Sequence, residues 1–451
     1  MSEESQVIEW FRVVRRRPGM YIGSTGSRGL YYMVHEVLNN SIEEAMAGYC
    51  NEINIIIHKD DSITIRDNSR GISVDNHPIY KIPFVEVMLT NLHAINESDN
   101  VYRVSGGIHG IGSSVVCALS AFLTIRIKRD GKIYQQSYQR GKKTSELIVI
   151  EECDINDTGT QITFQPDKEI FENIELDYKN LKERLRELAF LLKGVQFSLK
   201  NEKSEKKDYI AYYNTRGVAA FVDYLLESTQ QISESFYFKR EVHSVVVEVA
   251  ISYAADYTER IHSFVNTTKT LGGTHTQGFL NALTQAINNY ARKANLLKEK
   301  EEFRESHVRE GLCAIINLNI PDPLFEGASR TVLANSEVRE IVSSIVYEQL
   351  GLFLEKNSTI SKRIIAICRD ALSVLPLLHA FELSQLHSSQ DLSIPRSLFY
   401  RPWMQWLDPV SFKLLKESFC PLCGINGLIT GQEKQKKQKH VFCPNCENIV
   451  L

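Results

Sequence analysis

A glycine-rich segment, Ser105–Gly112, sets the strongest limit on how this chain folds. Glycine is unfavourable inside helices and strands, and the segment leads directly into a small and apolar run, residues 113–121, that predicts a helix. A loop of this kind can bind phosphate, because its backbone N–H groups approach the oxygens and the helix N-terminus favours negative charge. The spacing matches neither the P-loop nor the dinucleotide fingerprint. The segment is therefore either a phosphate-binding loop or a plain flexible loop.

An amphipathic helix is predicted from Leu30 to Gly48, because apolar residues recur there at intervals of three and four. Glu36, Asn40 and Glu44 form a neighbouring stripe along it. Oxygen ligands one turn apart suit a hydrated Mg²⁺ ion, although a charged helix face is also typical of a surface in contact with water. Both interpretations of Glu36 and Asn40 stay open on spacing alone.

Two short β-rich runs follow, residues 53–58 and 62–67, and their short connection predicts a hairpin. Side chains alternate along a strand, so Ile63, Ile65 and Asp67 share one face. A carboxylate at the end of an apolar face is costly to bury unless it meets a partner. The position of Asp67 therefore indicates a ligand.

Composition and charge exclude several classes of protein. The chain has 451 residues, 43% hydrophobic and 24% charged, so it can bury large cores and divides most naturally into two or three domains. Its 52 basic and 55 acidic residues leave a net charge of −3, so contact with DNA would depend on local basic patches. No stretch approaches the roughly 18 apolar residues of a membrane span, and the start lacks a secretion signal. We therefore expect a cytoplasmic protein with no membrane partner.

The chain divides into four predicted segments with a mixed α+β character. Residues 1–213 form a first domain, and residues 214–371 form a second α/β domain that ends in a long helix. Residues 372–415 are a connector whose fold the pattern does not reveal. Residues 416–451 form a small metal-binding module.

Periodicity predicts individual elements within the first two segments. In the first, strands are expected at residues 123–128, 133–138 and 160–164, with a polar hairpin or loop at 201–208. In the second, strands are expected at residues 242–251 and 312–320, and helices at 277–294 and 336–354.

Four of the nine cysteines form two Cys-x-x-Cys pairs, Cys420 with Cys423 and Cys443 with Cys446, with nineteen residues between the pairs. Disulfides are disfavoured in the cytosol, and the Pro and Gly residues around each pair are typical of zinc knuckles rather than of incidental thiols. We therefore predict a four-thiolate Zn²⁺ ribbon. The basic run at residues 434–440 between the pairs is either a phosphate contact or a solvated tip. The remaining cysteines are isolated and are predicted to be free thiols: Cys50, Cys117, Cys153, Cys313 and Cys368.

The order of the motifs resembles the ATPase superfamily of gyrase, chaperones, histidine kinases and mismatch-repair proteins (GHKL). That order is Glu36 with Asn40, then residues 67–71, 106–112 and 158–160. Longer strings, which span about residues 7–354, narrow the resemblance to the B subunit of DNA gyrase or topoisomerase IV: residues 17–23, 104–112, 272–275, 309–312 and 321–323. The chain is thereby identified as a member of the type IIA topoisomerase B-subunit family. The resemblance implies a GHKL (Bergerat) ATPase sandwich followed by an α/β transducer domain like ribosomal protein S5, to which the zinc ribbon is added.

The resemblance implies how phosphates would be held. Glu36 matches the general base that polarises the water attacking the γ-phosphate, and Asn40 matches the Mg²⁺ ligand that bridges the phosphates. The lid that wraps the triphosphate corresponds to the glycine-rich segment, with these ATP-binding residues: Ser105, Gly106, Gly107, His109, Gly110 and Gly112.

The resemblance also implies how the base would be held. Asp67 matches the carboxylate that accepts the adenine amino hydrogen, and Thr160 matches its helper. Gly71 lets the backbone close over the ring, while Arg70 and Glu44 match a pair that frames the purine pocket. ATP and Mg²⁺ are thus the expected ligands.

Four positions depart from the family pattern. In the transducer loop, Ala328 and Arg330 stand where the family places a Gln and a Lys that sense the γ-phosphate. Arg330 can still neutralise developing charge, and we count it as catalytic, but it is planar and longer than Lys, so we expect slower hydrolysis. Ser69 stands where the family has Gly, and Asn39 where it has Asp.

The chain lacks the acidic residues of the family's cleavage domain, because it has neither Glu-Gly-Asp-Ser nor any Asp-x-Asp pair. We therefore expect an ATP-hydrolysing clamp that cannot pass DNA strands by itself. Two alternatives are a nucleotide-gated module that binds DNA or a partner with little turnover, and the ATPase half of a topoisomerase whose cleavage subunit is a separate chain. The family also implies a homodimer on ATP binding, although no tyrosine precedes Val7 to reach the partner.

Overall fold

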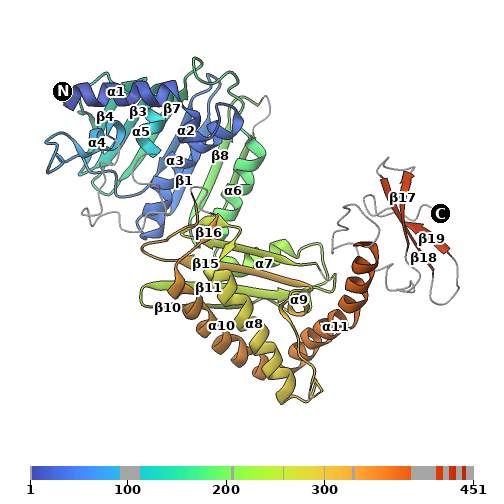
Figure 1. Ribbon diagram of the computed structural model, residues 1–451. Coiled ribbons are helices and arrows are strands. Elements are labelled where there is room, and N and C mark those ends of the chain that lie inside the picture. Colours follow the sequence, from blue (N-terminus) through green and yellow to red (C-terminus); the bar gives the residue numbers. More distant parts are fainter. Residues whose placement is uncertain are drawn as a thin grey trace.

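The computed structural model of the chain describes residues 3–91, 112–204, 208–256, 258–298, 300–327, 331–386, 413–419, 426–432 and 439–442. These residues form two large units, each with its own sheet, and a small third sheet (Figure 1). Several predicted site residues lie outside the described residues: Ser105, Gly106, Gly107, His109, Gly110, Ala328, Arg330, Cys420, Cys423, Cys443 and Cys446.

The N-terminal unit is a nine-stranded sheet covered by helices. Its strands are β1 (Glu52–Ile57), β2 (Ile63–Asp67), β3 (Ser120–Arg129), β4 (Lys132–Gln139), β5 (Lys142–Lys143), β6 (Ile148–Glu152), β7 (Gly159–Pro166), β8 (Gln196–Asn201) and β9 (Asp208–Tyr212). Its helices are α1 (Glu3–Arg16), α2 (Gly19–Ile22), α3 (Ser27–Met46), α4 (Phe84–Thr90), α5 (Gly112–Leu119) and α6 (Tyr178–Leu191). The strand order is β5-β4-β3-β7-β2-β1-β8-β9, with β6 on β4, and β1 and β8 pair in parallel.

The predicted helix and hairpin near the N-terminus are confirmed. The helix α3 begins at Ser27, slightly before the predicted start, and it buries its apolar stripe, including Leu30, Val34 and Leu38, against the sheet. The strands β1 and β2 pair antiparallel as a hairpin, with Ile53 opposite Asp67. This pairing places the carboxylate of Asp67 inside the unit, 7% exposed.

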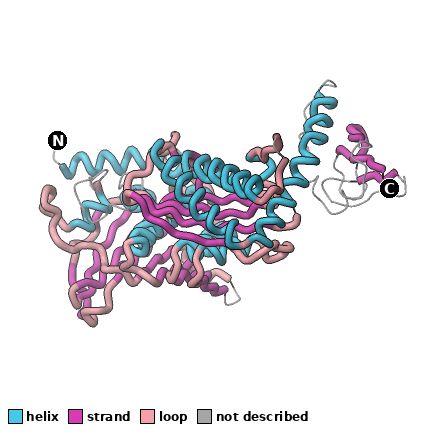
Figure 2. The backbone as a smooth tube through the Cα atoms, turned by 90° about the horizontal axis from the view of Figure 1, so that it is seen from below, coloured by secondary structure: helices cyan, strands magenta, loops and turns pink. Residues whose placement is uncertain are grey.

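The second unit is a five-stranded sheet of order β10-β11-β15-β12-β13, with a two-stranded β14-β16 ladder beside it. Its strands are β10 (Phe236–Val242), β11 (Val245–Tyr253), β12 (Arg260–Val265), β13 (Thr268–Thr270), β14 (Gly272–Gly273), β15 (Leu312–Asn319) and β16 (Val332–Leu333). Its helices are α7 (Val218–Leu225), α8 (Thr274–Lys293), α9 (Glu305–Val308), α10 (Ser336–Lys356) and α11 (Ser358–Leu386). Figure 2 shows the strands of both large sheets with helices packed along them.

The two faces of the five-stranded sheet have different partners, because side chains alternate along β11. Val247 and Val249 join the core formed with α8 and α10. Ala250, on the opposite face, joins a smaller core with α7 and with Leu191 of α6. The fold is therefore mixed α+β, as predicted.

The C-terminal part departs from the sequence-based division. The helix α11 continues past residue 372 to Leu386, so the first part of the segment that had no predicted fold is helical. The small sheet consists of β17 (Lys413–Phe419), β18 (Asn426–Gln432) and β19 (Lys439–Phe442), paired antiparallel in that order. Of the helices in the described ranges, none is both long and apolar enough to cross a membrane.

Helix α6 joins the two large units through Arg184, which is 8% exposed. Its Nη2 donates to the carbonyl oxygen of Thr267, in the turn between β12 and β13, at 3.0 Å. Asn266 and Thr267 both have positive φ, at 47° and 65°, as a tight two-residue hairpin turn requires. The guanidinium of Arg184 thus holds a strained turn of the second unit against the first.

We expect Arg184→Met to lower the free energy of unfolding by about 1.5–3 kcal/mol, because it removes a buried charge-assisted hydrogen bond. Urea unfolding followed by tryptophan fluorescence measures the loss. The matched control is Lys269→Met, which breaks the more exposed ion pair with Glu187 at 3.0 Å and is expected to cost less than about 1 kcal/mol. Equal losses in the two variants would contradict this role for Arg184.

Candidate functional site

The carboxylate of Asp67 is at the centre of a buried hydrogen-bond cluster. Its Oδ1 accepts the backbone N–H groups of Ser69 at 3.1 Å and of Thr160 at 3.0 Å. Its Oδ2 accepts the hydroxyl of Ser41 at 2.6 Å. The predicted helper Thr160 contacts Asp67 through its backbone, while its hydroxyl accepts the N–H of Ile72 at 3.2 Å.

A charged pair lies beside this cluster. Arg70 makes two hydrogen bonds to the carboxylate of Glu44, at 3.0 and 2.6 Å, in a bidentate geometry that fixes the guanidinium plane. The guanidinium carbon of Arg70 also lies 3.8 Å from the ring centroid of Tyr49. The predicted pairing of Arg70 with Glu44 is therefore present, and Tyr49 is a third member that the sequence did not reveal.

The backbone at Gly71 has the left-handed conformation, with φ of 73°. A Cβ atom there would lie 2.6 Å from the carbonyl oxygen of Lys128, so a side chain has no room. Arg129, at the end of β3, donates to the Gly71 carbonyl at 2.7 Å and fixes this peptide. Ser69, where the family has Gly, is accommodated because its hydroxyl accepts the N–H of Gly71 at 3.3 Å.

A second carboxylate, that of Glu36, meets the start of helix α5. Glu36 is 8% exposed, and a Cβ atom added to Gly112 would lie 1.7 Å from its Oε2, so glycine alone allows this approach. One turn along α3, the Nδ2 of Asn40 donates to the hydroxyl of Ser113 at 3.1 Å. Glu36 and Asn40 thus both face the N-terminus of α5, where the glycine-rich segment ends.

The described part of the predicted site comes from four parts of the N-terminal unit, of which α3, α5 and β7 are labelled in Figure 1. Helix α3 carries Glu36, Asn40 and Glu44. Strand β2 ends at Asp67, and the turn after it carries Arg70 and Gly71. Strand β7 carries Thr160, and α5 begins at Gly112. Sequence patterns missed Ser41, Ser113, Tyr49 and Arg129, because each acts through a contact distant in sequence.

His35 lies next to Glu36 on α3, and its Nδ1 is 3.1 Å from the Nδ2 of Asn39. Burial, together with the positive charge of Arg184, lowers the pKa of His35 to about 3. The imidazole is therefore neutral at pH 7 and accepts the Asn39 amide hydrogen. An Asp at position 39 would instead favour the protonated imidazole, so Asn39 suits the neutral ring.

We expect the lowered pKa of His35 to make stability depend on pH. The unfolded chain binds a proton at His35 below its ordinary value of 6.5, while the folded chain does so only near 3, so acid favours unfolding in this window. The free energy of unfolding contributed by this residue falls by about 1–2 kcal/mol between pH 7.5 and pH 5. Urea unfolding of wild type and His35→Gln at both pH values measures this loss of stability. Equal losses in the two proteins would contradict the assignment of the loss to His35.

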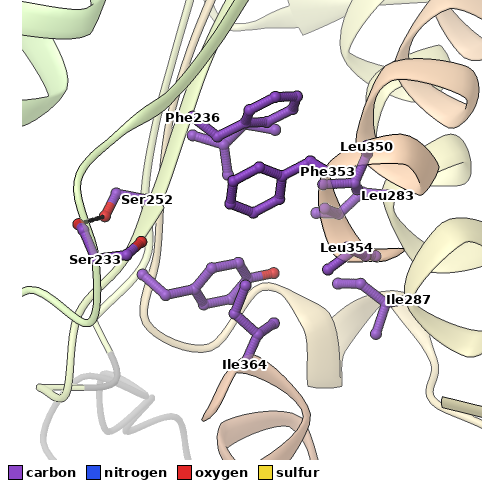
Figure 3. A pocket seen from close by; sticks show the side chains of 11 residues that line it. Ser233, Phe236, Ser252, Leu283, Ile287, Leu350, Phe353, Leu354 and Ile364 are labelled. Carbon is purple, nitrogen blue, oxygen red and sulfur yellow. Dashed lines mark hydrogen bonds between the residues drawn. The ribbon is translucent and has the colours of Figure 1, made fainter. Parts of the chain in front are cut away.

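An apolar pocket in the second unit lies between the five-stranded sheet and helices α8, α10 and α11 (Figure 3). The rings of Phe236 and Phe353 stack in it with centroids 4.2 Å apart. The hydroxyl of Ser252 donates to the carbonyl of Ser233 at 3.1 Å. An accessible volume of about 10 Å³ is room for about one water molecule. The pocket is therefore a packing gap rather than a ligand site.

The sequence has a run of three basic residues at 15–17, and the first of them has a structural partner. Arg15 donates to Asp167 at 2.7 Å and to the carbonyl of Ala118 at 3.0 Å, which ties α1 to the end of α5. Arg140 lies 2.9 Å from the same carboxylate. Arg16 and Arg17 are exposed. Arg15 therefore serves the fold rather than a DNA contact.

The five isolated cysteines are free thiols, as predicted. Burial raises the pKa of Cys50 to about 12, so this thiol beside Asp67 stays protonated. Within the described ranges, no group of three or more His, Cys, Asp or Glu side chains forms a metal site. The two Cys-x-x-Cys pairs fall outside those ranges.

Comparison with known families and proteins gives matches over most of the chain. Residues 25–170 match the family of histidine kinase-, DNA gyrase B- and HSP90-like ATPases, and residues 217–373 match DNA gyrase B. The DNA gyrase B subunit of Clostridium acetobutylicum is 45% identical over 369 residues, which are 81% of this chain and 57% of that protein. The DNA topoisomerase 4 B subunit of Bacillus subtilis is 45% identical over 358 residues, which are 78% of this chain and 54% of that protein. The chain thus spans somewhat over half the length of these relatives.

Solved structures agree with these matches. The 43K ATPase domain of Thermus thermophilus gyrase B, in complex with an aminocoumarin, superposes with a TM-score of 0.71 at 35% identity, covering 83% of this chain and 98% of that one. The topoisomerase IV ATP-binding domain of Francisella tularensis, in complex with a small-molecule inhibitor, gives a TM-score of 0.68 at 30% identity. This match covers 79% of this chain and 95% of that one. Together with the motifs and the buried cluster around Asp67, these likenesses show that the chain belongs to the B-subunit family of DNA gyrase and topoisomerase IV, with the GHKL ATPase and transducer domains of that family.

Proposed function

We propose that this chain binds ATP with Mg²⁺ and hydrolyses it slowly, as a clamp of the type IIA topoisomerase B-subunit family. The observation that carries the proposal is the convergence of two buried carboxylates, Glu36 and Asp67, from separate elements of the N-terminal unit. One lies at the N-terminus of a helix that follows the glycine-rich segment, and the other lies in a cluster of hydrogen-bond donors. Such an arrangement suits a ligand with a phosphate end and a base end.

The base end is formed around Asp67. A carboxylate that acts only as an acceptor can take a hydrogen bond from an exocyclic amino group. This amino group distinguishes adenine from purines that carry a carbonyl at the same position. Arg70, fixed by Glu44 and Tyr49, forms a wall beside it. The left-handed backbone at Gly71 keeps this side of the pocket free of a side chain.

The phosphate end is formed by Glu36 and Asn40. Because Asn40 donates its amide hydrogen to Ser113, its amide oxygen is oriented away from that bond, and oxygen is the ligand atom that Mg²⁺ prefers. Asn40 therefore fits the ion, which when bound would neutralise phosphate charge. Glu36 is the group that would orient and deprotonate the attacking water. Position 330 is an Arg where the family has a Lys. An Arg side chain is planar and longer than Lys, and this difference supports slow turnover.

The experiment that tests this proposal is phosphate release from ATP by the purified chain, with and without Mg²⁺. We expect slow release that requires Mg²⁺. No phosphate release and no ATP binding by folded protein would refute the proposal.

A second candidate function is a nucleotide-gated module with little turnover, and the replacement of the family's Gln and Lys by Ala328 and Arg330 favours it. A single-turnover assay separates the two functions, because tight ATP binding with negligible phosphate release supports the gated module. DNA, a homodimer formed on ATP binding and a separate cleavage subunit are the partners that the family suggests. DNA relaxation only in a mixture with such a subunit would identify a split topoisomerase.

We also propose that the C-terminal sheet belongs to a Zn²⁺ ribbon. Strands β17 and β19 run in the same direction, because both pair antiparallel with β18. Cys420 directly follows Phe419 at the end of β17, and Cys443 directly follows Phe442 at the end of β19. The chain therefore leaves β17 and β19 at the same end of the sheet, and each Cys-x-x-Cys pair follows one of these two strands in the sequence. The four thiolates of two such pairs are the ligand set of a tetrahedral structural zinc site.

We expect purified wild type to hold about one zinc ion per chain, because four thiolates complete one structural site. Cys443→Ser removes a ligand and is expected to lose most of the metal. The control is Cys153→Ser, which changes an isolated free thiol. Mass spectrometric metal analysis measures the content. A wild type without zinc, or equal zinc in Cys443→Ser, would contradict the ribbon.

A further inference from the structure

The lone pairs of Asp67 can be counted. A carboxylate offers about four acceptor positions, two on each oxygen. On Oδ1, both are taken by the backbone N–H groups of Ser69 and Thr160. On Oδ2, one is taken by the hydroxyl of Ser41. Within the described part of the chain, one acceptor position of Asp67 is therefore left, and it is on Oδ2.

Ser41 is the side-chain member of this set, since the other two donors are backbone groups that substitution cannot remove. Its hydrogen bond is short, at 2.6 Å, and both partners are buried, with Ser41 3% and Asp67 7% exposed. A serine inside a helix commonly donates to the carbonyl oxygen one turn earlier. Ser41 donates instead to a carboxylate 26 residues away, so its hydroxyl has a specific partner.

We propose that Ser41 is a specificity-determining residue for the nucleobase, an inference that rests on the proposed binding of ATP. The hydroxyl occupies one lone pair of Oδ2 and turns the other toward the ligand. The carboxylate then presents a single oriented acceptor to the base. An amino group at this position of a purine donates to it, while a carbonyl oxygen there is a second acceptor and is repelled.

Removal of the hydroxyl has a definite consequence for selectivity. In Ser41→Ala, Oδ2 is no longer held by a donor from α3, so the carboxylate can rotate away from its fixed orientation and take up water. Orientation of the acceptor toward an amino group is then weaker, and the repulsion of a carbonyl is relieved by the added water. ATP affinity therefore falls while inosine triphosphate affinity does not, so the ratio of the two affinities shrinks.

The experiment measures binding of ATP and of inosine triphosphate by calorimetry to full-length wild type, Ser41→Ala and Ser41→Thr. The ratio of the two affinities is expected to fall about tenfold in Ser41→Ala, the size of one hydrogen bond to a charged group, and to be retained in Ser41→Thr, which keeps the hydroxyl. The matched control is Ser120→Ala, which removes another buried hydroxyl with a 2.6 Å bond, donated to the carbonyl of Val116. The ratio of ATP affinity to inosine triphosphate affinity in Ser120→Ala is expected to stay at the wild-type value.

An unchanged ratio in Ser41→Ala, or an equal fall in Ser120→Ala, overturns the role of Ser41. Circular dichroism establishes that each variant is folded before its ratio is compared. If folded wild type binds neither nucleotide, the proposed function fails and this inference fails with it. If wild type binds ATP and the ratio does not respond to Ser41→Ala, only this inference fails.

Discussion

Glu36→Gln is expected to lower Mg²⁺-dependent ATP turnover by about 10²- to 10⁴-fold, the usual contribution of a general base. The amide keeps the shape of the side chain at the N-terminus of α5, but it cannot take a proton from water. ATP affinity is expected to change only a few-fold, because the base end of the site is untouched. Steady-state phosphate release and calorimetric binding separate the two effects.

The control for this substitution is Glu183→Gln on helix α6, which removes an exposed carboxylate elsewhere in the same unit. Turnover by this variant is expected to match that of the wild type. Equal turnover by wild type and Glu36→Gln would exclude Glu36 as the general base, whatever its effect on binding.

Asp67→Asn is expected to weaken ATP binding by about 100-fold. The two backbone N–H groups on Oδ1 select the orientation of the new amide, since its oxygen must face them. The amide nitrogen then takes the place of Oδ2, so an acceptor becomes a donor facing the amino group of adenine. A donor facing a donor leaves both unpaired, which costs about 1–3 kcal/mol for each buried group.

The same substitution is expected to improve the relative binding of inosine triphosphate, whose carbonyl oxygen can accept from the new amide. Calorimetry with both nucleotides measures this exchange of preference. Asp157→Asn is the control, because it removes a half-exposed carboxylate paired with Lys128 on the surface. An ATP affinity that survives Asp67→Asn would show that the base is recognised elsewhere.

The sequence predicted those parts of the site that depend on local periodicity. The stripe of Glu36, Asn40 and Glu44 follows from the helical repeat of α3. The inward direction of Asp67 follows from alternation along β2, which pairs with β1 as a hairpin. In both cases the pattern lies within one element, so it is visible in a single window of sequence.

Contacts between distant elements could not be predicted in the same way. Ser41 is an ordinary polar residue inside a helix until the fold brings it to Asp67. The approach of Gly112 to Glu36 depends on how α5 packs against α3. The structural role of Arg15 depends in the same way on the position of Asp167, which is 152 residues away in the sequence.

Some strands had no usable pattern. Strand β6 is exposed along its whole length, so Ile148, Val149 and Ile150 do not alternate between a buried and an open face. Strand β10 precedes β11 through a turn at His243 and Ser244, which have positive φ without being glycine. Turns of this kind lack the glycine or proline signal from which hairpins are predicted.

The N-terminal unit is proposed to hold an adenine nucleotide between Glu36 and Asp67, and every other functional expectation depends on this binding. Calorimetric titration of folded, full-length protein with ATP and Mg²⁺ tests it most directly. We expect saturable binding heat with about one nucleotide per chain, the number of such sites expected for one unit of this kind. No heat with ATP, or equal heat with ATP and inosine triphosphate, would contradict it.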